Sequence, residues 1–183
     1  MARTKAAPWG NRILSHGTMR AGDFLANPEN WRTHGLAQEA QLTSLLDDVG
    51  FVGEVMVNKR THASWPKGLR GVETMVDGHL RVKAALARGE DTPVPYFYVD
   101  LTPEEERRVL LTLDPIGAMA GRDDDLLAGL RTQVETEWPD SIMDIDVLIK
   151  PERKRSKGLT HEVHECTCCK AGCAPGCGCY RGD

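Results

Sequence analysis

The sequence predicts one α/β domain, a small mixed sheet with packed helices, followed by a cysteine-rich tail. Short apolar segments typical of strands alternate along the chain with longer segments of helical periodicity, and this alternation indicates helices packed on a sheet. At 183 residues and 40% hydrophobic content, the chain can bury one core. We expect the domain to span residues 9–149, with a basic linker at residues 150–160 and a Cys/His-rich tail at residues 161–183.

Composition limits the classes of function. The net charge of -4 argues against a protein that coats nucleic acid by bulk charge, although a local basic groove is compatible with it. No apolar run is long enough to span a bilayer, so no membrane partner is expected. The N-terminus lacks the apolar stretch of a signal peptide, and we therefore expect a cytoplasmic location.

The first half of the domain should contain three strands and one helix. We expect strands at Arg12–Ser15, Val52–Asn58 and Val72–Val76, and a helix at Leu36–Val49 that Gly50 ends. The predicted helix carries one apolar stripe at helical spacing, made of Leu42, Leu45, Leu46 and Val49.

The second half should contain three helices and one strand. A helix is expected at Gly78–Arg88, with Val82, Ala85 and Leu86 toward the core, and a strand at Val94–Val99. The next helix has a strong start signal, which consists of Thr102 as N-cap, Pro103 at the first helical position and Glu105 at the capping-box position. A fourth helix should begin at Asp123–Asp125.

The turn from Asp77 to Arg81 has the features of an anion site. An apolar strand ends and a helix begins here, and Asp77 is a good N-cap residue. The amides of Gly78, His79 and Leu80 then lack partners within the helix and meet the positive end of its dipole. Arg81 lies one turn beyond Asp77 and can grip a phosphate with two hydrogen bonds.

A simpler interpretation is that Asp77 and Arg81 form only a surface ion pair, worth about 0.3 kcal/mol, in a helix that binds nothing. Spacing alone does not decide between the two. The segment Asn27–Arg32 favours the binding site, because its amides, its aromatic ring and Arg32 could bring a second cation to the same phosphate.

The order of these motifs resembles that of the ParB/sulfiredoxin superfamily, and in particular its ParB-like N-terminal (ParB-like nuclease) domain. The segments that carry the resemblance are Asn27–Arg32, the Leu-rich helix ending at Val49–Gly50, Val55–Val57, Val76–Arg81 and Val94–Pro95. It covers roughly Ile13 to Leu130. With Leu111–Gly117 downstream, the chain is most similar to phage and bacterial ParB-like proteins that accompany DNA-modification genes.

The resemblance implies a ParB/sulfiredoxin-like fold with a nucleotide pocket, and members bind CTP or ATP, which we expect here together with Mg²⁺. By position, the residues that would hold phosphate and line the pocket are Gly78, Arg81, Asn27, Asn30 and Arg32. Asp77 and His79 would be the catalytic acid–base or metal–water pair. Reductase members need a cysteine in this turn, and partition members carry a helix-turn-helix domain after it, so neither role is expected.

Three hypotheses follow. The first is a ParB-like nucleotide-binding, DNA-associated protein, with or without nucleotide hydrolysis, whose partners include a second copy of itself or a DNA-modification protein. The second is a phosphotransferase or nuclease that acts on nucleic acid through Asp77 and His79. The third is a non-catalytic adaptor that binds its partner through the tail.

The tail concentrates all the cysteines of the chain. The potential metal ligands are Cys166, Cys168, Cys169, Cys173, Cys177 and Cys179, with His161 and His164 as further candidates. Thiolates and imidazoles suit Zn²⁺, although the spacing is not that of paired zinc knuckles. The alternative is a disordered tail that binds metal adventitiously or oxidises.

Overall fold

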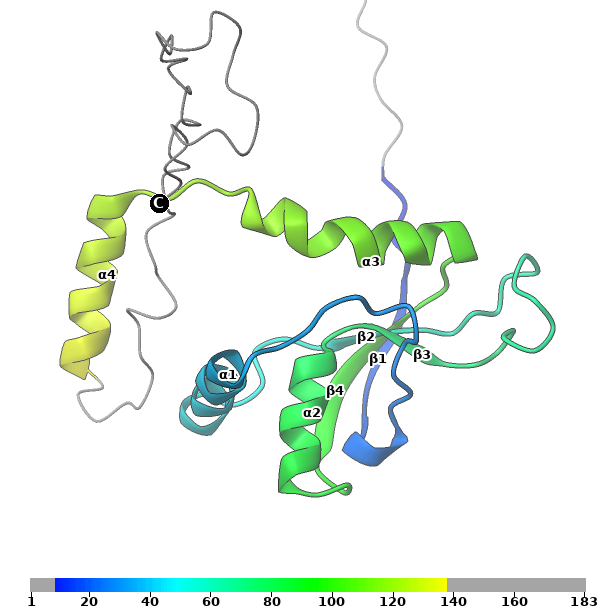
Figure 1. The fold of residues 1–183 in the computed structure, drawn as a ribbon, viewed down its shortest axis with the longest axis horizontal. Helices are drawn as coiled ribbons and strands as arrows, with labels where there is room; N and C mark the ends of the chain where they lie inside the picture. The colour runs from blue at the N-terminus through cyan, green and yellow to red at the C-terminus, as the bar shows by residue number, and fades with distance from the viewer. Residues whose placement is uncertain (1–8, 138–183) are drawn as a thin grey trace, which may run out of the picture. The chain divides into compact units, whose positions relative to one another are not determined.

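The computed structural model describes residues 9–137, and the predicted linker and cysteine tail lie outside this range. Figure 1 shows the order of elements. These are β1 (Ile13–Arg20), the 3-10 turn η1 (Ala21–Asp23), α1 (Leu36–Asp48), β2 (Val55–Asn58), β3 (Thr74–Asp77), α2 (His79–Arg88), β4 (Pro93–Val99), α3 (Pro103–Ala118) and α4 (Asp124–Glu137). The predicted mixed α/β class is confirmed. None of these helices is long and apolar enough to cross a membrane.

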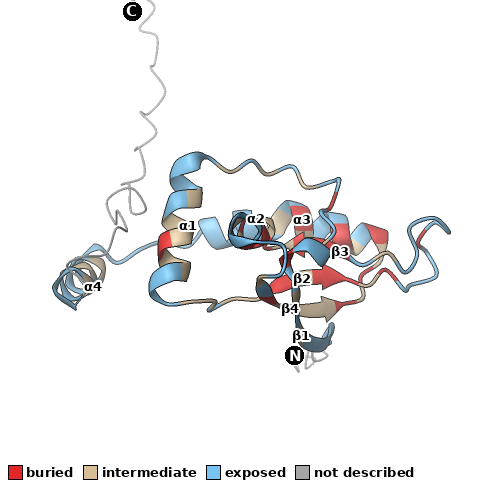
Figure 2. Ribbon diagram, turned by 90° about the horizontal axis from the view of Figure 1, so that it is seen from below, coloured by how far each residue is buried: buried red, intermediate tan, exposed pale blue. Residues whose placement is uncertain are grey.

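The sheet has four strands in the order β1-β4-β2-β3. β4 pairs antiparallel with β1 and parallel with β2, and β2 pairs antiparallel with β3. The central strands β2 and β4 carry the core, in which Val55, Val57 and Val94 pack against Val82 and Ala85 of α2. Figure 2 shows buried residues on β2 and β3, whereas no residue of α4 is buried.

The first two helices lie side by side (Figure 1) and are joined by ion pairs. Lys83 pairs with Glu39, and Arg88 pairs with Asp47. Both helices end at a glycine, as expected. Gly50 follows α1 with a φ of 89°, and Gly89 is the C-cap of α2.

The predicted start of α3 is confirmed in full. The Thr102 hydroxyl accepts a hydrogen bond from the Glu105 amide at 3.3 Å, and the Thr102 amide donates to the Glu105 carboxylate at 2.9 Å. Pro103 occupies the first helical position. Local side-chain chemistry is sufficient to place this helix end.

Several local expectations were wrong, among them the start of β2, which begins at Val55 and not at Val52. β1 extends to Arg20 because it pairs with β4 along its whole length, and that pairing does not depend on the polar pattern of β1 itself. Its Gly17 lies beneath Tyr96, where an added Cβ would be 2.8 Å from the phenol oxygen. Val49 is exposed because it is already the C-cap of α1, and Leu86 is exposed because α2 turns it away from the core cluster.

Asp77 is not the N-cap of α2, contrary to expectation. It is the last residue of β3, and Gly78 is the N-cap, with a φ of 92° and no side-chain capping bond. The carboxylate of Asp77 is engaged instead by two arginines, described below. An added Cβ at Gly78 would lie 3.2 Å from the Val55 Cα atom, so both the conformation and the space require glycine here.

Gly50 and Gly78, two of the four glycines with positive φ among the described residues, provide a matched test. Gly50→Ala should lower the free energy of unfolding by about 1–2 kcal/mol, the strain of a left-handed residue, because nothing lies within 4 Å of the added Cβ. Gly78→Ala should cost clearly more, since Val55 backbone adds a steric clash. Denaturant unfolding of the two variants measures the difference, and equal losses would contradict the packing argument.

Candidate functional site

The two turns singled out in the sequence meet in the folded domain. The Arg32 guanidinium lies 3.2 Å from one carboxylate oxygen of Asp77, and the Arg81 guanidinium lies 3.5 Å from the other. These three side chains come from the loop before α1, the end of β3 and the first turns of α2. The expected pair Asp77–Arg81 therefore exists, but as part of a larger charge cluster.

Arg32 is the most enclosed cation of this cluster, with only 12% of its side chain exposed. Its Nη2 donates to the Leu110 carbonyl oxygen at 3.4 Å, and its Nε lies 2.9 Å from a carboxylate oxygen of Asp114. That Nε is buried, yet it has no hydrogen bond of acceptable geometry. Two arginines thus face two carboxylates, so an incoming anion must replace Asp77 or Asp114 as their partner.

Arg81 is reached more easily from solvent. It donates to the Glu54 carbonyl oxygen at 3.4 Å and lies against Gly53, where an added Cβ would be 3.3 Å from its guanidinium. Beside it is a pocket of about 140 Å³, whose lining residues are Leu42, Leu45, Leu46, Gly50, Phe51, Val52, Gly53 and Arg81. The pocket is apolar apart from this one guanidinium.

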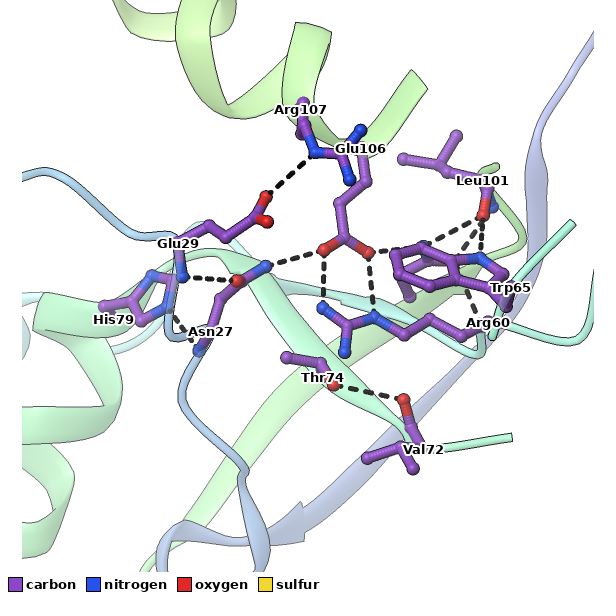
Figure 3. A network of polar contacts seen from close by, with 11 residues as sticks. Asn27, Glu29, Arg60, Trp65, Val72, Thr74, His79, Leu101, Glu106 and Arg107 are labelled. Atoms are coloured by element: carbon purple, nitrogen blue, oxygen red, sulfur yellow. Dashed lines mark hydrogen bonds and ion pairs between the residues drawn. The ribbon is translucent and has the colours of Figure 1, made fainter. Parts of the chain in front are cut away.

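His79 is held by the neighbouring turn (Figure 3). Its Nε2 accepts a hydrogen bond from the backbone amide of Asn27 at 3.3 Å. Burial lowers the pKa of His79, and the nearby Arg32 and His34 lower it further, while Asp77 opposes the change. The neutral ring is therefore favoured, with the lone pair of Nε2 directed at the Asn27 turn.

Asn27 and Asn30 shape the turn that carries Arg32. The side-chain oxygen of Asn27 accepts from the Glu29 amide at 2.9 Å, and that of Asn30 accepts from the Arg32 amide at 3.4 Å. The Asn30 amide also donates to the Asn27 carbonyl at 3.1 Å. Both side chains were expected to line a pocket, and both use these oxygens within the turn itself.

A buried network that the sequence did not reveal supports this turn (Figure 3). Glu106 of α3, 1% exposed, accepts from the Asn27 side-chain amide at 2.8 Å and from Asn58 at 2.6 Å. Arg60 donates to both of its oxygens, at 2.6 and 3.1 Å. Among the described residues, Arg60 is the non-glycine residue with a positive φ, at 52°. Its guanidinium stacks on the ring of Trp65. No spacing rule marks Glu106 within its run of three glutamates.

Within residues 9–137, no group of three or more His, Cys, Asp or Glu side chains is placed to hold a metal ion by itself. The predicted tail ligands, from His161 to Cys179, lie outside the described residues.

Adjacent glutamates test the importance of burial. Glu106→Gln leaves the buried Arg60 without a counter-charge, and the free energy of unfolding should fall by about 3–5 kcal/mol. Glu105→Gln removes an exposed ion pair with Arg12 but keeps a capping-box residue, so its effect should stay within about 1 kcal/mol. Denaturant unfolding compares them, and a mild effect of Glu106→Gln would show that the network is dispensable.

His79 should make stability depend on pH. Its pKa is lowered in the folded state, so the unfolded chain, with an ordinary value of 6.5, binds the proton more tightly. The contribution of neutral His79 to the free energy of unfolding is therefore fully present above pH 6.5. It is lost as the pH falls from 6.5 toward the lowered pKa of the folded state. His79→Gln should flatten this part of the profile, measured as unfolding free energy against pH, and the exposed His62→Gln is the matched control. An unchanged slope in His79→Gln would contradict the assignment.

Comparison with known proteins places the fold. No family model matches the chain, and no curated protein matches it. The chain is similar to the crystal structure of the C-terminally truncated chromosome-partitioning protein ParB from Caulobacter crescentus complexed with CTP-gamma-S. That match has a TM-score of 0.51 and 17% identity, and covers 67% of this chain and 63% of that one.

A second match is the C2221 form of a Pnob8-like ParB-N domain, with a TM-score of 0.43 and 11% identity over 70% of this chain and 52% of that one. The described residues, a small mixed sheet with packed helices, therefore have a fold similar to that of the C-terminally truncated ParB.

Proposed function

We propose that this domain binds a nucleoside triphosphate, CTP or ATP, in a DNA-associated protein, and that Arg32, Arg81 and the backbone at Gly78 hold the phosphates. The observation that carries the proposal is the convergence of two arginines from distant turns on Asp77, at the N-terminal end of α2. Guanidinium groups and a helix N-terminus are the groups that proteins use to bind phosphate.

The start of α2 supports this assignment. Gly78 is in the left-handed conformation, and no side chain caps the helix, so the amides of its first turn are not used by a capping residue. Glycine at this position also lets a ligand approach the backbone closely.

The carboxylates of the cluster fit a nucleotide that arrives with Mg²⁺. Once phosphate oxygens replace them as partners of the arginines, Asp77 and Asp114 offer hard oxygen ligands of the kind that Mg²⁺ takes. The bound ion would neutralise charge on the phosphates, and these two residues would hold it. CTP is the first nucleotide to test, because the ParB of similar fold is in complex with a CTP analogue.

Contact with DNA is a further part of the proposal. Many surface arginines of the domain are paired with acids, among them Arg12, Arg20, Arg88 and Arg107. The lysines and arginines of the linker at residues 150–160 are therefore the cations that we assign to DNA. We also propose a protein partner, which is either a DNA-modification protein or a second copy of the chain. The proposed location is the cytoplasm, and the proposed origin is a phage or a bacterium.

The geometry favours binding over catalysis. A general base needs a free lone pair, whereas Nε2 of His79 accepts the Asn27 amide. Phosphotransfer, nucleotide hydrolysis or nuclease activity through Asp77 and His79 remains a prediction, to be tested with labelled ATP and with plasmid DNA. Turnover that persists unchanged in His79→Ala and Asp77→Asn would reject these roles.

The adaptor hypothesis concerns the tail. We propose that its cysteines bind Zn²⁺, and elemental analysis of protein purified without a histidine tag should then find stoichiometric zinc. Absence of zinc from freshly reduced protein would reject the proposal.

Nucleotide binding itself is measured by titrating CTP and ATP, with Mg²⁺, into wild type and arginine variants. Arg32→Ala and Arg81→Ala should each weaken binding about tenfold to a hundredfold, since each removes charge-assisted hydrogen bonds to phosphate. Arg88→Ala, on the same helix but paired with Asp47, should bind like wild type. Thermal unfolding confirms that each variant is folded.

Two results would contradict the proposal. Wild type that binds neither nucleotide rejects it outright. Equal losses in Arg81→Ala and Arg88→Ala would show that the assigned arginine has no special role.

A further inference from the structure

The indole of Trp31 is a large apolar surface beside the proposed phosphate site, and 58% of the residue is exposed. A side chain of this size is usually mostly buried, so its exposure next to a polar cluster indicates a contact surface for a ligand. We propose that Trp31 is a stacking surface for the aromatic base of the nucleotide whose phosphates Arg32 holds. This inference rests on the proposed function and adds a base subsite to it.

Trp31 is fixed in place although it is exposed. Its Nε1 donates to the Leu110 carbonyl oxygen of α3 at 3.0 Å, and the same oxygen accepts from Arg32 at 3.4 Å. The ring is therefore oriented before any ligand arrives, and stacking on it loses little side-chain entropy.

Position along the chain brings the two subsites together. Trp31 and Arg32 are consecutive, with the guanidinium turned inward and the indole outward, and the Arg32 Cζ atom lies 5.9 Å from the indole centroid. A ligand with phosphate at Arg32 and an aromatic ring one sugar away has the span to reach Trp31. The buried Arg32 Nε lies 2.9 Å from Asp114 without a well-aligned hydrogen bond, and it would donate to such an anion once the anion displaces this carboxylate.

Trp65 shows how the same anchor serves a purely structural role. Its indole nitrogen also donates to a backbone carbonyl, that of Leu101, at 2.8 Å. Only 6% of Trp65 is exposed, and the Arg60 guanidinium lies 4.5 Å from its ring centroid. Trp31 has the same anchoring bond without that burial, which leaves ring surface for a ligand.

Stacking tolerates every base, because each has a π-face, so Trp31 should contribute affinity to CTP and ATP alike. The test compares Trp31→Phe with Trp31→Leu. Both variants lose the bond to Leu110, but only phenylalanine keeps an aromatic face. Binding of CTP, ATP and inorganic tripolyphosphate is measured by calorimetry with Mg²⁺ present, and thermal unfolding checks that both variants fold.

Trp31→Leu should weaken both nucleotides about tenfold relative to Trp31→Phe, and the two variants should bind tripolyphosphate equally. Nucleotide should also quench wild-type tryptophan fluorescence, and the quench should be lost in Trp31→Phe and kept in Trp9→Phe. Equal nucleotide affinities in the two Trp31 variants would overturn the inference, and so would a parallel loss of tripolyphosphate binding.

The measurements distinguish a failure of the stacking subsite from a failure of the proposed function. If wild type binds no nucleotide, both proposals fall. If Arg81→Ala abolishes nucleotide binding while Trp31→Leu and Trp31→Phe bind equally, only the stacking subsite is wrong.

Discussion

The buried carboxylate of Glu106 joins three distant parts of the chain, and the rest of the site depends on it. Its two oxygens accept hydrogen bonds from Asn27 before α1, from Asn58 at the end of β2 and from Arg60 in the loop that follows. A carboxylate this far from water is stable only when its partners are complete. The same bonds hold α3 against the sheet and set the position of the Asn27 turn, which in turn holds His79 and presents Arg32.

The arginine cluster around Asp77 is held together less completely than the buried network around Glu106. Only 12% of the Arg32 side chain and 32% of the Arg81 side chain are exposed, and their contacts with Asp77, at 3.2 and 3.5 Å, are longer than those that Arg60 makes with Glu106. A phosphate, which carries more negative charge than a carboxylate, can replace Asp77 or Asp114 as the partner of these arginines. The buried network therefore provides rigidity, while the cluster beside it provides groups that a ligand can recruit.

Sequence reasoning succeeded where local chemistry decides the structure. The capping box at Thr102 and the glycine after α1 depend on atoms within a few residues, and both were predicted correctly. It failed at Asp77, whose residue type favours a helix cap, because the carboxylate is engaged by Arg32 from a distant loop as well as by Arg81 four residues on. The extent of β1 was also underestimated, since its polar residues pair with β4 through backbone bonds that no side-chain pattern reports.

The sequence alone determined the alternation of strands and helices, the helix ends that glycine and proline mark, and the two motifs around Arg32 and Arg81. All of these are properties of neighbouring residues. Only the tertiary structure decided that Arg32 faces Asp77 and Asp114, that His79 accepts a bond from Asn27, and that Trp31 is anchored yet exposed. Each of these is a contact between segments far apart in the chain. Their meeting depends on the packing of α3 and α2 on the sheet, which residue spacing does not encode.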